Sequence, residues 1–106
     1  MDSSLYKDII TSRGLKYHYY HSPAQTGKAT LFFCHGFPST SKDWRRMVPF
    51  FTDAGYGVIA PDMLGYGGTD KPLDPTLYVG SAVAKDLVDI VDAENLEKVV
   101  AVGHDW

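Results

Sequence analysis

Short apolar runs alternate with segments of helical periodicity along the 106 residues of this chain. The runs Ala29 to Cys34, Val58 to Ala60 and Val99 to Val102 are continuous, which is typical of strands that are buried on both faces. Two stretches with apolar residues at helical spacing separate these runs. The order of strand, helix, strand, helix and strand predicts an α/β fold with a mostly parallel sheet and helices on both faces.

A hairpin pattern precedes these elements. Ile9 to Ser12 and Leu15 to Tyr20 resemble strands, and Arg13-Gly14 joins them. Because glycine permits a positive φ at this place, we expect a tight turn and an antiparallel hairpin at the N-terminal side of the parallel strands.

Both helical stretches have an apolar face that should lie in the core. Pro49 in the first stretch predicts a kink or a late helix start, and Gly55 is well placed to end that helix. The apolar positions are Trp44, Met47, Val48 and Phe51 in the first stretch, and Val83, Leu87, Ile90 and Val91 in the second. Four charged positions of the second helix are expected to face solvent: Lys85, Asp86, Asp89 and Asp92.

Charge and composition argue against several kinds of partner. Ten basic and thirteen acidic residues give a formal charge of -3, and the pair Arg45-Arg46 is the densest basic stretch, so we expect no nucleic-acid partner. Without a signal-peptide pattern or a long apolar run, a cytoplasmic protein with no membrane association is expected. The single cysteine, Cys34, lies in an apolar run and is interpreted as a buried hydrophobe rather than a reactive thiol.

The segment Gly103-His104-Asp105-Trp106 follows a predicted strand, which is the context of a nucleophile elbow with Asp105 at its tip. A helix that began after Trp106 would keep Asp105 ionised through its N–H groups and dipole. Gly103 supplies the small residue that such a turn requires. We therefore expect Asp105 to be a nucleophile, with Gly103 and His104 shaping the loop.

The segment His35-Gly36-Phe37-Pro38 follows an earlier strand, and carboxyl ends of neighbouring parallel strands meet at one edge of a sheet. The backbone N–H groups of Phe37 and Trp106 could converge there as an oxyanion hole. Pro38 has no N–H to donate and holds Phe37 out of the helical region, so the donor is expected to be Phe37. His35, Gly36 and Pro38 are interpreted as residues that shape this loop.

A glycine-rich loop from Pro61 to Pro75 lies between the two regions. Asp62 and Asp70 are interpreted there as turn and cap residues, because the glycine spacing matches no phosphate-loop fingerprint. We expect neither a cofactor nor a metal ion.

Three segments together resemble the epoxide hydrolase branch of the α/β-hydrolase fold: His35 to Pro38, Ala60 to Pro72 and Gly103 to Trp106. The resemblance covers nearly the whole chain and marks residues 1–106 as the N-terminal segment of a catalytic domain, without its lid and C-terminal half. It implies that Asp105 attacks a small apolar epoxide to form an ester, which a histidine-activated water hydrolyses to a vicinal diol. The triad histidine, its acid and the lid tyrosines of that family find no counterpart here, so the 106 residues alone are expected to be inactive.

Two alternatives stay open. A haloalkane or haloacetate dehalogenase of the same fold also uses an aspartate nucleophile, but the combination of Phe37 and Trp106 favours the epoxide. The chain could also be a non-catalytic, truncated product, and a reading frame that continues past Trp106 to a small residue and a later histidine would argue against this.

Overall fold

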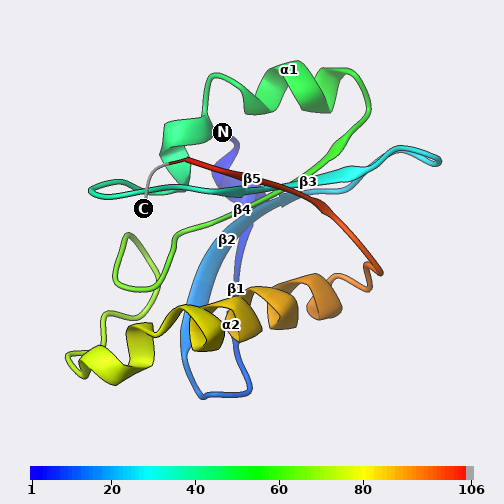
Figure 1. The fold of residues 1–106 in the computed structure, drawn as a ribbon. Helices are drawn as coiled ribbons and strands as arrows, with labels where there is room; N and C mark the ends of the chain where they lie inside the picture. Colours follow the sequence, from blue (N-terminus) through cyan, green and yellow to red (C-terminus); the bar gives the residue numbers. More distant parts are fainter. Residues whose placement is uncertain (105–106) are drawn as a thin grey trace.

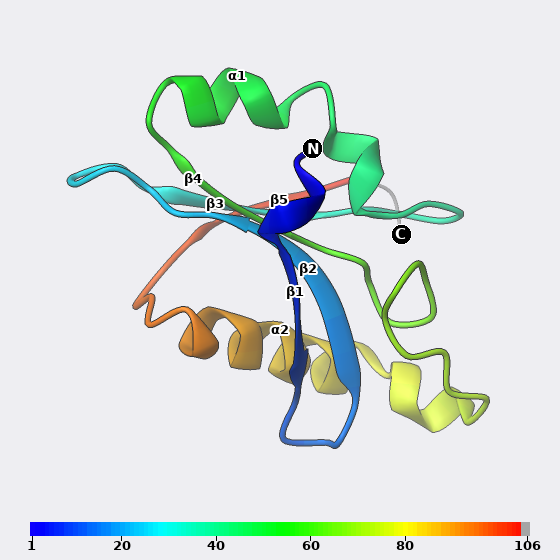
Figure 2. The ribbon, with the colours of Figure 1, turned by 180° about the vertical axis from the view of Figure 1, so that it is seen from behind.

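The structure is a computed structural model that describes residues 1–104. A five-stranded sheet lies between two helices, with α1 (Val48–Asp53) on one face and α2 (Gly80–Ala93) on the other (Figures 1 and 2). The strands are β1 (Tyr6–Ile10), β2 (Lys16–Ser22), β3 (Thr30–Cys34), β4 (Gly57–Pro61) and β5 (Val100–Gly103). Their order across the sheet is β1-β2-β4-β3-β5. Short 3₁₀ helices cover Ser3–Leu5, Ser41–Trp44 and Pro75–Tyr78.

The predicted hairpin is present, but its first strand lies earlier than the expected Ile9 to Ser12, because Thr11 and Ser12 already belong to the connection. β1 pairs with β2 in antiparallel register, and Gly14 in the connecting turn has a φ of +78°. The turn closes through hydrogen bonds from the Gly14 N–H to the Thr11 carbonyl and from the Thr11 N–H to the Leu15 carbonyl, both 2.9 Å. β2 also pairs antiparallel with β4, which joins the hairpin to the rest of the sheet.

β3, β4 and β5 form the predicted parallel part of the sheet. β3 lies between the other two, with Leu31 opposite both Val58 of β4 and Val100 of β5. The α/β architecture inferred from the alternation of elements is therefore confirmed. Because the three strands run in one direction, their carboxyl ends and the loops that follow them meet at one edge of the sheet (Figure 1).

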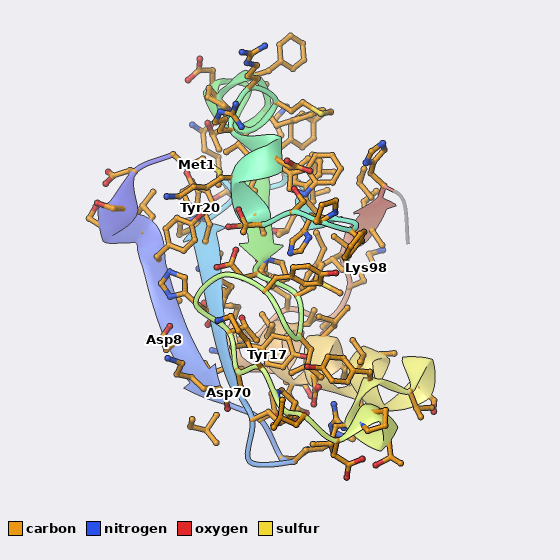
Figure 3. All side chains as sticks on the ribbon, turned by 90° about the vertical axis from the view of Figure 1, so that its left-hand side faces the viewer. Met1, Asp8, Tyr17, Tyr20, Asp70 and Lys98 are labelled. Atoms are coloured by element: carbon orange, nitrogen blue, oxygen red, sulfur yellow. The ribbon has the colours of Figure 1, made fainter. Side chains whose placement is uncertain are left out.

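Alternation along the strands divides the core into two halves. Phe33 of β3 points toward α1 and packs against Trp44, with ring centroids 4.8 Å apart, whereas Phe32 belongs to the half beneath α2 together with Ile90. β2 follows the same rule, and Figure 3 shows Tyr20 on the α1 side of the sheet and Tyr17 on the α2 side. Strands covered on both faces explain the continuous apolar runs of the sequence.

The first helix starts late, as Pro49 predicts. The 3₁₀ helix Ser41–Trp44 comes first, with the Thr40 hydroxyl accepting a hydrogen bond from the Lys42 N–H, and α1 follows with its proline in the first turn. The expected core position of Met47 is wrong, because its side chain is 43% exposed. Met47 lies in the turn between the two helices, where the regular helical spacing from Trp44 is lost.

Asp86 of α2 was expected to face solvent, and this expectation is wrong. The residue has no exposed surface, because Arg13 in the turn between β1 and β2 and Tyr17 of β2 bind its carboxylate. Lys85 and Asp92 are exposed as expected, and Asp89 is partly covered because it accepts hydrogen bonds from Ser12.

The last predicted strand is present as β5, but Val100 is half exposed rather than buried. Within residues 1–104, β5 is the outermost strand and pairs with β3 alone, so one of its edges and part of its surface are left uncovered. None of the helices in this part of the chain has both the length and the apolar character needed to cross a bilayer.

Candidate functional site

The register of β3 and β5 brings the two motif loops together. Cys34 at the end of β3 lies opposite Gly103 at the end of β5, and the His104 N–H donates a hydrogen bond of 3.2 Å to the Cys34 carbonyl. The chain thus leaves β5 beside the start of the His35 to Pro38 loop. Asp105 and Trp106 lie outside the described residues, so the nucleophile and the second oxyanion donor remain predictions.

His35 joins the loop after β3 to the loop after β4. Its ring is buried, its Nε2 accepts a hydrogen bond of 2.9 Å from the Met63 N–H, and its Nδ1 lies 2.9 Å from the Gly36 carbonyl oxygen. Because the Met63 amide can only donate, Nε2 carries no hydrogen, and we assign the hydrogen to Nδ1, which donates to Gly36. These contacts agree with a loop-shaping role for His35.

Phe37 presents its side chain to solvent at this edge, with 67% of it exposed. Its ring lies edge-on to the ring of Tyr66, with the two centroids 6.4 Å apart. The Tyr66 ring also lies edge-on to the His35 ring, with 5.2 Å between the centroids. The peptide bond between Phe37 and Pro38 is cis. Among residues 1–104, none accepts a hydrogen bond from the Phe37 amide, which leaves that donor available to a ligand.

Asp62 ties the same region together from the end of β4. Its Oδ1 accepts a hydrogen bond from the Ser41 N–H and its Oδ2 one from the Gly68 N–H, both 2.9 Å, while its carbonyl accepts from the Thr69 hydroxyl. The carboxylate is buried and both oxygens are occupied. Asp62 therefore ties the segments at Ser41 and Gly68 to the end of β4. Asp70 ties the glycine-rich loop to β2, because its carboxylate accepts a hydrogen bond of 2.8 Å from the Lys16 N–H.

A surface cavity of about 510 Å³ opens beside Asp62, but it is not the candidate site. Tyr6, His18 and Ser41 line it, with the Tyr6 hydroxyl 2.6 Å from the Ser41 hydroxyl and the His18 ring stacked on the Tyr6 ring. Neither Phe37 nor His104 belongs to its lining. We place the candidate site at the junction of β3 and β5, where the described residues of the two motif loops lie side by side.

Cys34 lies at that junction, and burial raises the pKa of its thiol to about 11. A thiol with such a pKa is protonated near neutral pH and a poor nucleophile, which agrees with the interpretation of Cys34 as a small hydrophobe. In the part of the chain that the structure describes, no three histidine, cysteine or carboxylate side chains come together in a way that could hold a metal ion.

Sequence reasoning found the two motif loops but missed the residues that hold them. Met63 acts through its backbone N–H and Tyr66 through the edge of its ring, so neither contact leaves a recognisable pattern in one sequence. One feature of the sequence pointed to these contacts. The His35 to Pro38 loop and the glycine-rich loop each follow one of two neighbouring parallel strands, β3 and β4.

Comparison with known proteins agrees with this geometry. The sequence profile of the alpha/beta hydrolase fold matches residues 29–106. The chain therefore belongs to the α/β-hydrolase fold family.

The similar proteins named below are all of one kind within this family, the epoxide hydrolases. The chain is 44% identical over 97 residues to an epoxide hydrolase of Caballeronia sordidicola, and 40% identical over 82 residues to epoxide hydrolase A of Mycobacterium tuberculosis. These matches cover 92% and 77% of this chain but only 29% and 26% of the two relatives. The chain thus spans less than a third of the length of the curated relatives it matches.

Solved structures of epoxide hydrolases are also similar to this chain. Epoxide hydrolase A of Mycobacterium thermoresistibile superposes with a TM-score of 0.86 at 33% identity, over 95% of this chain and 31% of that one. An epoxide hydrolase of Vigna radiata superposes with the same TM-score at 29% identity, over 95% of this chain and 32% of the other.

Proposed function

We propose that this chain supplies the nucleophile and the oxyanion hole of an epoxide hydrolase that converts a small apolar epoxide to a vicinal diol. The observation that carries the proposal is the parallel pairing of Cys34 with Gly103, which starts both motif loops at one edge of the sheet. The similarity to several epoxide hydrolases supports the same reaction.

In the first step, a carboxylate oxygen of Asp105 attacks an epoxide carbon, the ring C–O bond breaks, and the alkoxide takes a proton from an acid. An aspartate is already anionic near neutral pH, so this step needs no base. The product is an ester between Asp105 and the opened substrate. We propose that the acid, and the histidine that acts as a base later, come from segments of the enzyme other than these 106 residues.

In the second step, water that has lost a proton to the histidine adds to the carboxyl carbon of Asp105. Negative charge then develops on an oxygen of Asp105 itself, where the N–H groups of Phe37 and Trp106 stabilise it. When this intermediate collapses, its C–O bond to the substrate breaks and the leaving alkoxide takes the proton from the histidine to give the diol. The carboxyl group then loses its proton to solvent, which restores the carboxylate, and the acid of the first step regains a proton from solvent. The amide of Phe37 supports this assignment, because it has no acceptor among residues 1–104 and lies in the loop beside which β5 ends.

The aromatic surface of the loop supports an apolar substrate. Phe37 is largely exposed and is braced edge-on by Tyr66, so apolar area is available at the edge of the sheet where β3 and β5 end.

The test uses the full-length enzyme and the variant Asp105→Asn, whose amide keeps the shape of the carboxylate but is a poor nucleophile. Brief mixing of the wild type with an aryl epoxide should place one substrate adduct on the peptide that contains Asp105, detected by mass spectrometry. The variant should form no adduct and no diol when activity is read early, before deamidation. An adduct on another peptide would exclude Asp105. A parallel assay with a haloalkane in place of the epoxide tests the alternative, because halide release from it without diol formation from the epoxide would indicate a dehalogenase.

A further inference from the structure

We infer that His35 is a positioning residue for the oxyanion hole, because its ring fixes the peptide group that carries the Phe37 N–H. The inference rests on the proposed function and assigns to His35 a task in one step of that reaction. The contact that carries it is the hydrogen bond of 2.9 Å from His35 Nδ1 to the Gly36 carbonyl oxygen.

The carbonyl of Gly36 and the N–H of Phe37 belong to the same planar peptide group. In a trans peptide these two bonds point in opposite directions, so a partner that holds the carbonyl also sets the direction of the N–H. Glycine at position 36 offers little resistance to rotation of this group. The hydrogen bond from His35 therefore supplies an orientation that the backbone alone would not keep.

His35 is itself held from several directions. Its Nε2 accepts from the Met63 N–H at 2.9 Å, its ring is buried, and Tyr66 lies against it edge-on with an angle of 88° between the rings. The bond from Met63 also decides which nitrogen carries the hydrogen. Because Nε2 must accept, Nδ1 is left as the donor that the Gly36 carbonyl needs. The loop after β4 thus orients the Phe37 amide through His35.

This arrangement predicts an effect on one chemical step. The oxyanion forms when water attacks the aspartyl ester, whereas alkylation of Asp105 places no new charge on its carboxyl group. A misplaced Phe37 N–H should slow ester hydrolysis and leave alkylation near its normal rate. A residue that merely stabilised the fold would affect both steps or neither.

Two substitutions separate the two nitrogens of His35. The side-chain amide of His35→Asn can place an N–H near the position of Nδ1 and keep the bond to Gly36, while that of His35→Gln reaches toward the position of Nε2 and keeps the bond from Met63. In single-turnover experiments on the full-length enzyme, His35→Gln should hydrolyse the ester about 10- to 100-fold more slowly and accumulate the adduct on Asp105. His35→Asn should retain most of the hydrolysis rate.

Equal losses in both steps, or equal losses in the two variants, would overturn the inference. If His35→Gln does not fold, Tyr66→Ala removes the ring that packs edge-on against both His35 and Phe37. It should slow ester hydrolysis more than alkylation, and equal losses in the two steps would again overturn the inference. A wild-type enzyme that forms no ester would refute the proposed function instead. In that case crystal structures of His35→Asn and His35→Gln test separately whether His35 orients the Gly36–Phe37 peptide. The inference is wrong if that peptide keeps its orientation in both variants.

Discussion

Arg13 and Asp86 form a paired contact in which Arg13 Nε lies 2.9 Å from Asp86 Oδ1 and Arg13 Nη2 binds Asp86 Oδ2. Arg13 is in the turn of the hairpin, and Asp86 is a fully buried residue of α2. The Tyr17 hydroxyl donates a further hydrogen bond of 2.7 Å to Oδ2, and Arg13 Nη1 donates to the Leu77 carbonyl. The pair fastens α2 to the hairpin and so fixes the helix on its face of the sheet.

Replacing Arg13 by Met should destabilise the protein strongly. The substitution leaves the Asp86 carboxylate buried without its cation, a situation that costs about 3–5 kcal/mol in the free energy of unfolding. The double variant Arg13→Met, Asp86→Leu removes both charges and should recover most of that loss. Urea denaturation of the full-length protein and of the two variants measures these differences.

Lys85→Met is the matched control. Lys85 also pairs with an aspartate of α2, but its Nζ lies 3.2 Å from Asp89 Oδ1 at the surface. An exposed pair of this kind contributes about 0.5 kcal/mol or less. If Arg13→Met cost no more than Lys85→Met, the buried pair would not fasten the helix as we argue.

Gly67→Ala should disturb the loop that Asp62 holds. Gly67 has a φ of +53°, and a Cβ added there would lie 2.3 Å from Asp62 Oδ2, so the carboxylate would have to leave the Gly68 N–H. Losing one buried hydrogen bond costs about 1–3 kcal/mol in addition to the backbone strain. A lower thermal unfolding midpoint and weaker hydrogen-exchange protection of the Gly68 amide are the expected results.

Gly14→Ala isolates the strain. Gly14 also has a positive φ, +78°, but no heavy atom lies within 4 Å of an added Cβ. This variant should lose only the roughly 1–2 kcal/mol of an alanine in the left-handed region. Equal destabilisation of the two variants would show that contact with Asp62 is unimportant.

The sequence was sufficient for features that depend on neighbouring residues. The alternation of strands and helices, the turn at Gly14 and the late start of α1 at Pro49 all follow from local backbone preferences. The position of the two motif loops also followed, because parallel strands bring their carboxyl ends to one edge.

Contacts between distant residues could not be predicted in this way. Asp86 lies on the charged stripe of an amphipathic helix, and only the fold shows that Arg13, 73 residues away, covers it. The same holds for His35, whose second partner is a backbone amide 28 residues later. A single sequence indicates that such polar groups exist but not which of them meet.

Glu94, at the end of α2, gathers three partners from the hairpin. Its Oε2 accepts from Lys7 Nζ at 2.7 Å and from the Tyr19 hydroxyl, and its Oε1 lies 3.0 Å from His21 Nδ1. Burial lowers the pKa of His21 below its ordinary 6.5; Glu94 opposes this shift and Lys7 adds to it. Burial would raise the pKa of Glu94, but the hydrogen bonds from Lys7 and Tyr19 outweigh it, so that pKa is lowered from 4.5. Near neutral pH the ring of His21 is therefore uncharged, with its Nδ1 beside the Glu94 carboxylate.

Acid should weaken this cluster in two separate windows. Because the folded protein disfavours the charged form of His21, its contribution to stability is present above pH 6.5 and declines as the pH falls through the lowered pKa. The contribution of Glu94 is present above pH 4.5 and declines only below that value. In His21→Asn, whose side chain is polar but cannot titrate, the unfolding midpoint should change less than in the wild type just below pH 6.5, while the decline below pH 4.5 persists. In Glu94→Gln the decline below pH 4.5 should be weaker than in the wild type. Midpoints measured by calorimetry across this pH range test both, and a wild-type decline that His21→Asn leaves unchanged would rule out His21 as its source.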